Sequence, residues 1–225
     1  MYRALEELDL VRVLAALAAR RPVFHSEADM QQELAWQIHL LHPAVGVRLE
    51  VRVPEPSRPG RRERVDVLLH TELGRVAIEL KYPTDALSAQ IADELVVLPR
   101  QGAQDVTTYD VVKDIHRVEH FVRTGLASAG AVIVISNDRS YWTDPGHGRA
   151  TAASAFRLYE GTVLSGSRSW GAAAGPGTTR GREPALELSG EHRLAWGPFS
   201  RIEGASRGEF RSLLVPVHPS DPARA

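Results

Sequence analysis

Hydrophobic residues recur along the chain with the two periods that distinguish helices from strands. Over residues 2–20 leucines and valines fall three residues apart, which predicts a helix with one apolar stripe. Pro22 ends it, because a helix rarely continues into the residue before a proline. A second stripe of helical period begins after Ser26, a residue type favoured at helix N-caps, and ends before Pro43. The second helix therefore places Glu27 in its first turn, on the side that faces inward.

Alternation of apolar and polar residues follows and predicts strands. Residues 45–53 alternate with the period of a half-buried strand. Residues 54–62 form a polar loop rich in proline and arginine. The runs at 64–70 and 75–81 are separated by Thr71-Glu72-Leu73-Gly74, an arrangement typical of a β-hairpin.

The second half of the chain returns to helical and then to strand patterns. An apolar stripe predicts a helix over residues 103–123, and Gly125 stops it. The continuous apolar run at 131–135 predicts a central strand covered on both faces. Residues 165–181 are rich in glycine, serine and alanine and indicate a mobile loop. The other predicted elements are a strand at 95–98, a helix near 150–159, and tail strands at 186–188, 193–196 and 213–215.

The predicted order is α, α, β, β-hairpin, α, β and then a mostly β tail, which defines a mixed α/β fold. A length of 225 residues is typical of one domain. We expect a single domain over residues 1–225, with an α-β-β-β-α-β core at 26–136 and a β-rich C-terminal extension at 140–218 packed on that core.

Composition excludes several classes of protein. The chain has no cysteine, which excludes a disulfide framework, a thiolate metal site and a cysteine nucleophile. No apolar run approaches the ~20 residues of a spanning helix, so we expect no membrane association through one. The first residues carry acids where an export signal would carry bases, and we expect a cytoplasmic protein. A net charge of -1 gives no overall preference for nucleic acid.

The predicted hairpin brings two acids together. If His70 pairs with Arg75, antiparallel positions sum to 145, so Asp66 faces Glu79. Side chains that face each other across a hairpin lie roughly 5 Å apart, and like charges there repel. A divalent cation would offset that repulsion, because hard cations such as Mg²⁺ bind one or two carboxylates together with waters and phosphates.

A simpler interpretation is that both acids point to solvent and Lys81 pairs with Glu79. Two features favour a site. The face that carries the acids also carries Leu68 and Ala77, so it is partly covered. Of the 27 basic residues only two are lysines, and one of them is Lys81. Lysine supplies a compact point charge where arginine supplies a planar fork.

Asp66 followed twelve residues later by Glu79-Leu80-Lys81, on a hairpin preceded by a Glu-bearing helix and a strand, resembles the PD-(D/E)XK nuclease superfamily. The resemblance implies a restriction-endonuclease-like fold over residues 26–136. It implies that Asp66, Glu79 and the Leu80 carbonyl bind Mg²⁺ or Mn²⁺. Lys81 would orient the attacking water and stabilise the charge that develops on phosphorus, and Glu27 would support the metal from the first core helix.

The same resemblance implies a nuclease that hydrolyses phosphodiester bonds in nucleic acid, with DNA as the expected substrate, in phage defence or DNA repair. Candidate contacts to nucleic acid are Gln104, Lys113 and Arg117 on the long helix and Arg64 beside the site. A homodimer or a larger defence or repair complex is an accompanying expectation.

Two alternatives remain open at this stage. The same fold could serve as a non-catalytic module that binds nucleic acid or a protein partner. His116, Glu119 and His120 also match the H-x-x-E-H pattern, in which two histidines bind zinc from one helix face and the glutamate acts as the base of a peptidase. The sequence shows no third zinc ligand for that alternative.

Overall fold

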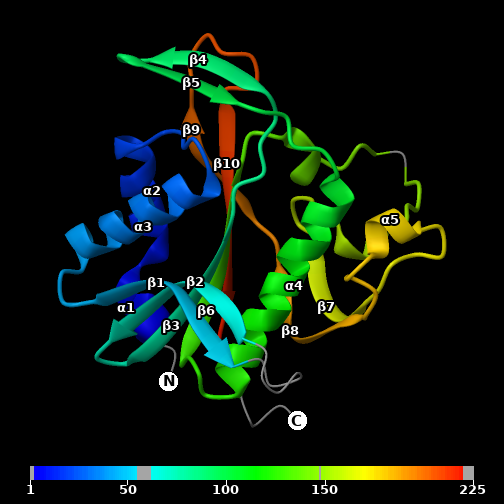
Figure 1. The fold of residues 1–225 in the computed structure, drawn as a ribbon, viewed down its shortest axis with the longest axis horizontal. Coiled ribbons are helices and arrows are strands. Elements are labelled where there is room, and N and C mark those ends of the chain that lie inside the picture. The colour runs from blue at the N-terminus through cyan, green and yellow to red at the C-terminus, as the bar shows by residue number, and fades with distance from the viewer. Residues whose placement is uncertain (1–2, 55–61, 147, 220–225) are drawn as a thin grey trace.

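A six-stranded mixed sheet forms the centre of the computed structural model, which describes residues 3–54, 62–146 and 148–219 (Figure 1). Neighbouring strands are antiparallel except β3 and β6, which run parallel. The strands lie in the order β1 (Gly46–Pro54), β2 (Arg62–Thr71), β3 (Gly74–Lys81), β6 (Ala129–Ser136), β10 (Glu209–Val217) and β9 (Trp196–Arg201).

Helices cover both faces of this sheet (Figure 1). One face packs against α1 (Arg3–Leu8), α2 (Leu10–Arg20) and α3 (Glu27–Leu41), and the other packs against α4 (Gln104–Arg123). Successive side chains of β3 point to opposite faces of the sheet, so this strand contributes to the cores on both sides. Val76, Ile78 and Leu80 join the core below α1–α3, whereas Ala77 joins a core that includes Phe121 of α4. The α/β class predicted from the sequence is confirmed.

The core elements follow the predicted order, α3, β1, β2, β3, α4 and β6. The hairpin register is also confirmed: Val67 pairs with Ile78 and His70 with Arg75, so that paired positions sum to 145. Between β3 and α4 the chain adds a separate hairpin of β4 (Leu87–Ile91) and β5 (Glu94–Leu98), which lies beyond one end of the sheet in Figure 1. The predicted strand at 95–98 is β5.

The predicted helix at 2–20 is in fact two helices. Asp9 adopts a left-handed conformation, with φ 40°, and its side chain accepts a hydrogen bond from Arg12 N at 3.1 Å. An aspartate tolerates this conformation and is a favourable N-cap, so it ends α1 and begins α2. The predicted helix near 150–159 is reduced to a single 3₁₀ turn, Ser154–Phe156.

The prediction of a mobile loop at 165–181 was wrong. This segment contains the end of β7 (Val163–Arg168), which pairs with β8 (Leu186–Arg193), and the short helix α5 (Pro176–Thr179). Trp170 fixes it, because the indole packs on Tyr109 with ring centroids 5.3 Å apart and donates to the Arg182 carbonyl at 2.9 Å. Glycine and serine content did not reveal that anchor.

The C-terminal extension is more closely integrated than the sequence suggested. β10 pairs with β6 and β9 pairs with β10, so two of its strands belong to the central sheet. Most of the predicted loop at 54–62 lies outside the described residues. No helix in the described part of the chain is long and apolar enough to cross a membrane.

Candidate active site

Two of the predicted acids are held by backbone amides at the end of β3. Asp66 on β2 accepts a hydrogen bond from Leu80 N at 2.8 Å, and Glu27 in the first turn of α3 accepts one from Tyr82 N at 3.0 Å. Residues 80 and 82 point their amides to the same edge because a strand repeats every two residues. The end of β3 therefore brings together carboxylates from a helix and a neighbouring strand.

Glu79 lies on the face of β3 that is covered by α4, and it is only 1% exposed. Its carboxylate pairs with the guanidinium of Arg117, with 3.1 Å between Oε1 and NH2. Arg117 also pairs with Asp114, one helical turn earlier on α4, at 3.0 Å. Asp114 is 4% exposed. Two buried carboxylates thus share one arginine.

Lys81 completes the cluster. Its ammonium lies 2.6 Å from Asp114 Oδ2 and donates to the Leu80 carbonyl at 2.9 Å. The simpler interpretation of the sequence expected Lys81 to pair with Glu79, but Lys81 pairs with Asp114 instead. The cluster contains four carboxylates, Glu27, Asp66, Glu79 and Asp114, and two cations, Lys81 and Arg117. Sequence reasoning identified Glu27, Asp66, Glu79 and Lys81 as the site, but it missed Asp114 and gave Arg117 a different role.

Burial and neighbouring charges shift the pKa values of Glu27, Asp66, Glu79 and Lys81. Burial raises the pKa of Glu27 and of Asp66, although Lys81 and backbone hydrogen bonds partly offset it. Burial, followed by repulsion from Asp114, raises the pKa of Glu79 well above its usual value. Burial alone would lower the pKa of Lys81, but Asp114 and Glu27 outweigh it and the pKa is raised. Lys81 is therefore an ammonium, and Glu27, Asp66 and Glu79 hold their protons more tightly than free carboxylates do.

The donor atoms fit a hard divalent cation in their chemistry. Asp66, Glu79 and Glu27 offer carboxylate oxygens and Leu80 offers a carbonyl, the ligand types that Mg²⁺ prefers. Glu79 Oε1 is buried and accepts no hydrogen bond, although it lies within ion-pair distance of Arg117. Among the described residues, no three His, Cys, Asp or Glu side chains are already arranged to hold a metal ion. The chemistry fits, and loading a cation requires the carboxylates to rearrange.

A second network supports Asp66 from behind. Gln31 of α3 donates through Nε2 to the Asp66 carbonyl at 2.7 Å and to Glu50 Oε1 at 3.1 Å. Glu50 has φ 53°, an uncommon backbone conformation for a residue other than glycine, in the middle of β1. Its other oxygen pairs with Arg64 at 3.2 Å. The strained residue and the buried amide fix β1 and β2 beside the cluster.

The four candidate contacts to nucleic acid separate in the structure. Arg117 lies inside the acid cluster, and Arg64 is exposed beside it, where it pairs with Glu50 and its carbonyl accepts from Arg117. Gln104 donates to Asp138 at 3.3 Å, after the end of β6. Lys113 is half-buried on α4. Arg117 and Arg64 therefore adjoin the predicted site, whereas Gln104 is bound to a different loop.

The proposed zinc-binding pattern on α4 has a structural use. Glu119 is buried, and its carboxylate accepts hydrogen bonds from Ser189 N at 2.8 Å and Gly190 N at 2.7 Å and contacts His192 Nε2 at 2.9 Å. Burial would raise the pKa of Glu119, but these hydrogen bonds outweigh it and the pKa is lowered. Glu119 fastens β8 to α4, and this bonding occupies the atoms that a peptidase base would need.

We expect Glu119→Ala to destabilise the fold by about 3 kcal/mol, because it removes the acceptor of the Ser189 and Gly190 amides and the partner of the buried His192 side chain. The measurement is the denaturant midpoint of unfolding, and Glu187→Ala on the exposed side of β8 is the matched control. Because the pKa of Glu119 is lowered, its contribution is present above the usual carboxyl pKa and is lost as the pH falls through the folded value. Equal stability of the two variants would contradict this role.

Comparison of the chain with known protein families, with curated proteins and with solved structures finds no match.

Proposed function

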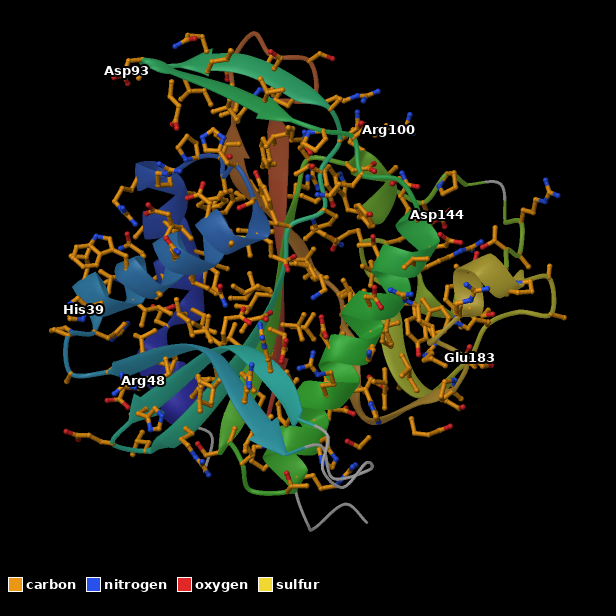
Figure 2. All side chains as sticks on the ribbon, viewed as in Figure 1. His39, Arg48, Asp93, Arg100, Asp144 and Glu183 are labelled. Carbon is orange, nitrogen blue, oxygen red and sulfur yellow. The ribbon has the colours of Figure 1, made fainter. Side chains whose placement is uncertain are left out.

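We propose that the protein is a Mg²⁺-dependent nuclease that hydrolyses phosphodiester bonds, with DNA as its substrate. One observation carries the proposal: Glu27, Asp66, Glu79 and Lys81, selected from the sequence by their resemblance to PD-(D/E)XK nucleases, converge at the end of β3. Figure 2 draws the side chains as sticks on the ribbon and labels Asp93 at the tip of the β4–β5 hairpin.

In this proposal Asp66, Glu79 and the Leu80 carbonyl hold the metal, and Glu27 supports it from α3. When bound, the metal supplies Lewis-acid chemistry, activating a water and neutralising charge on the phosphate. Asp66 is positioned by Leu80 N, and Glu27 by Tyr82 N, so neither carboxylate depends on a mobile loop. Lys81 is kept protonated by Asp114 and therefore orients the water and stabilises negative charge on the phosphate, rather than accepting a proton.

The test compares cleavage of plasmid and single-stranded DNA by the wild type and by Asp66→Asn, with Mg²⁺, Mn²⁺ or EDTA. We expect EDTA to abolish cleavage and Asp66→Asn to lower it at least about 10³-fold, since the metal and its charge neutralisation provide most of the rate. Asp93→Asn, in the exposed turn between β4 and β5, is the control and should cleave as the wild type does. Cleavage that survives both EDTA and Asp66→Asn would exclude the proposal.

A non-catalytic binding module is the second candidate, and one observation favours it. Lys81 and Arg117 already pair with the buried acids, so the cluster can be stable without a metal. In that case the protein would bind DNA without cutting it, and Lys81→Ala would leave the binding unchanged. Fluorescence anisotropy with labelled duplex and single-stranded oligonucleotides separates the two candidates.

A further inference from the structure

Arg117 lies between two carboxylates that are almost completely buried. Its NH2 is 3.1 Å from Glu79 Oε1, and its NH1 is 3.0 Å from Asp114 Oδ1. Its own side chain is 18% exposed, compared with 1% for Glu79 and 5% for Asp114. The guanidinium therefore reaches from the surface into the acid cluster.

The two acids differ in how they are neutralised. Asp114 pairs with both Arg117 and Lys81, so it retains a cation if Arg117 leaves. Among the described residues, Glu79 forms its ion pair with Arg117. A buried carboxylate requires a cation nearby, because burial strongly disfavours an isolated charge. While Glu79 is ionised, Arg117 can move away from it only when another cation takes its place.

Arg117 also has a second anchor, since its NH2 donates to the carbonyl of Arg64 on β2. Arg64 is exposed, so this contact lies at the outer edge of the cluster. Arginine is well suited to a role at such an edge, because its planar fork binds phosphate oxygens through two hydrogen bonds. A guanidinium released from Glu79 would remain beside the site, where a phosphodiester would lie.

We propose that Arg117 is the resident counter-ion of Glu79, that a divalent cation displaces it, and that the displaced guanidinium binds the phosphate of the substrate. The inference rests on the proposed function, because it assigns Glu79 to the metal. It gives a functional reason for the close pairing of Glu79, a proposed metal ligand, with Arg117. A single movement of the Arg117 side chain would then free Glu79 for the metal and bring the guanidinium to the phosphate of the substrate.

The experiment measures Mn²⁺ affinity by titration calorimetry at pH 8 for the wild type and for Arg117→Met. Removing a competing charge next to a divalent cation favours the cation, and we expect Mn²⁺ to bind about tenfold more tightly to Arg117→Met. Cleavage with Mg²⁺ should nevertheless fall about 100-fold, because the phosphate of the substrate no longer has the Arg117 guanidinium to bind it. A purely structural arginine would give weaker or unchanged Mn²⁺ binding.

Two further variants separate charge from position. Arg117→Lys keeps the positive charge and should bind Mn²⁺ with the affinity of the wild type. Arg123→Met removes an exposed charge from the last turn of α4, six residues away, and should change neither affinity nor cleavage. Circular dichroism with and without Mn²⁺ checks folding, and Arg117→Gln, which retains hydrogen-bond donors, replaces Arg117→Met if the latter unfolds without metal.

The outcomes distinguish the two proposals. If the wild type binds Mn²⁺ and cleaves DNA, but neither Arg117→Met nor Arg117→Gln binds Mn²⁺ more tightly, Arg117 is not a displaceable counter-ion and this inference is overturned while the nuclease proposal stands. If the wild type binds no Mn²⁺ and does not cleave DNA, the proposed function fails and the inference fails with it.

Discussion

Lys81→Met is expected to lower Mg²⁺-dependent cleavage by about 10³-fold, which corresponds to about 4 kcal/mol of transition-state stabilisation. Methionine keeps much of the length of the lysine stem but removes the ammonium that lies 2.6 Å from Asp114. The pKa of Lys81 is raised because Asp114 and Glu27 outweigh its burial, so the lost group is a fixed positive charge. A fixed charge in a site of low dielectric stabilises an oxyanion without reorganisation.

An Mn²⁺ affinity measurement and a control variant show whether the loss arises from the rate of cleavage or from metal binding. Mn²⁺ affinity should be retained or increased in Lys81→Met, because a cation has been removed from the cluster, so the loss lies in the rate and not in metal binding. Arg75→Met is the matched control: it removes a positive charge from the same face of β3, six residues away, where Arg75 donates to the Gly125 carbonyl at 3.1 Å. A Lys81→Met variant that cleaves at the wild-type rate would remove Lys81 from the chemistry.

The hairpin was predictable because two independent periodicities constrain it. Alternation along residues 64–70 and 75–81 fixes which side chains share a face, and the four residues between them fix the register. The observed pairs, such as Leu68 with Ala77, follow that register. The position of Glu27 in the first turn of α3 was also predictable, although the residue is exposed rather than turned inward and reaches the site through its hydrogen bond from Tyr82 N. These features depend on local patterns that a chain reveals without its tertiary structure.

Asp114 and Arg117 were harder to place because their partners are distant in sequence. Arg117 contacts Glu79 across 38 residues and the carbonyl of Arg64 across 53. One signal was present: Asp114 falls between Val111 and Val118 on the buried stripe of α4, where an unpaired charge would be costly. A carboxylate on an apolar stripe implies a buried cation opposite it, and that cation is Lys81.

The place of the C-terminal strands could not be deduced for a different reason. Strand periodicity shows that a segment is extended, but it does not show which neighbour it pairs with. β10 pairs with β6, and more than 70 residues separate the two in sequence. Likewise, the composition of residues 165–181 gave no sign that Trp170 would pack on Tyr109 and fix that segment.

Glu79→Gln is expected to abolish cleavage and to make the metal-free protein more stable. Four carboxylates share two cations in the cluster, and Asp114 is the nearest source of repulsion for Glu79. Removing the Glu79 charge relieves that repulsion and leaves Arg117 paired with Asp114. We expect a gain of about 1 kcal/mol at pH 8, or about 2–4 °C in the melting temperature of a chain of this size.

The pH dependence of unfolding tests the cause of this gain. Because the pKa of Glu79 is raised in the folded protein, the folded state binds more protons than the unfolded state, and wild-type stability falls as the pH rises from the ordinary value of 4.5 through the folded pKa. That fall should be smaller in Glu79→Gln, so the two curves diverge toward high pH. Glu72→Gln, in the exposed turn of the same hairpin, should follow the wild type.

Metal completes the comparison, because a ligand that binds only the folded state stabilises it. Mg²⁺ should raise the melting temperature of the wild type and of Glu72→Gln, but not that of Glu79→Gln. Glu79 would then be a residue whose burial costs stability in the metal-free protein and whose charge becomes favourable when a cation binds. If Glu79→Gln melts below the wild type at pH 8 and still responds to Mg²⁺, Glu79 serves the fold through Arg117 and is not a metal ligand.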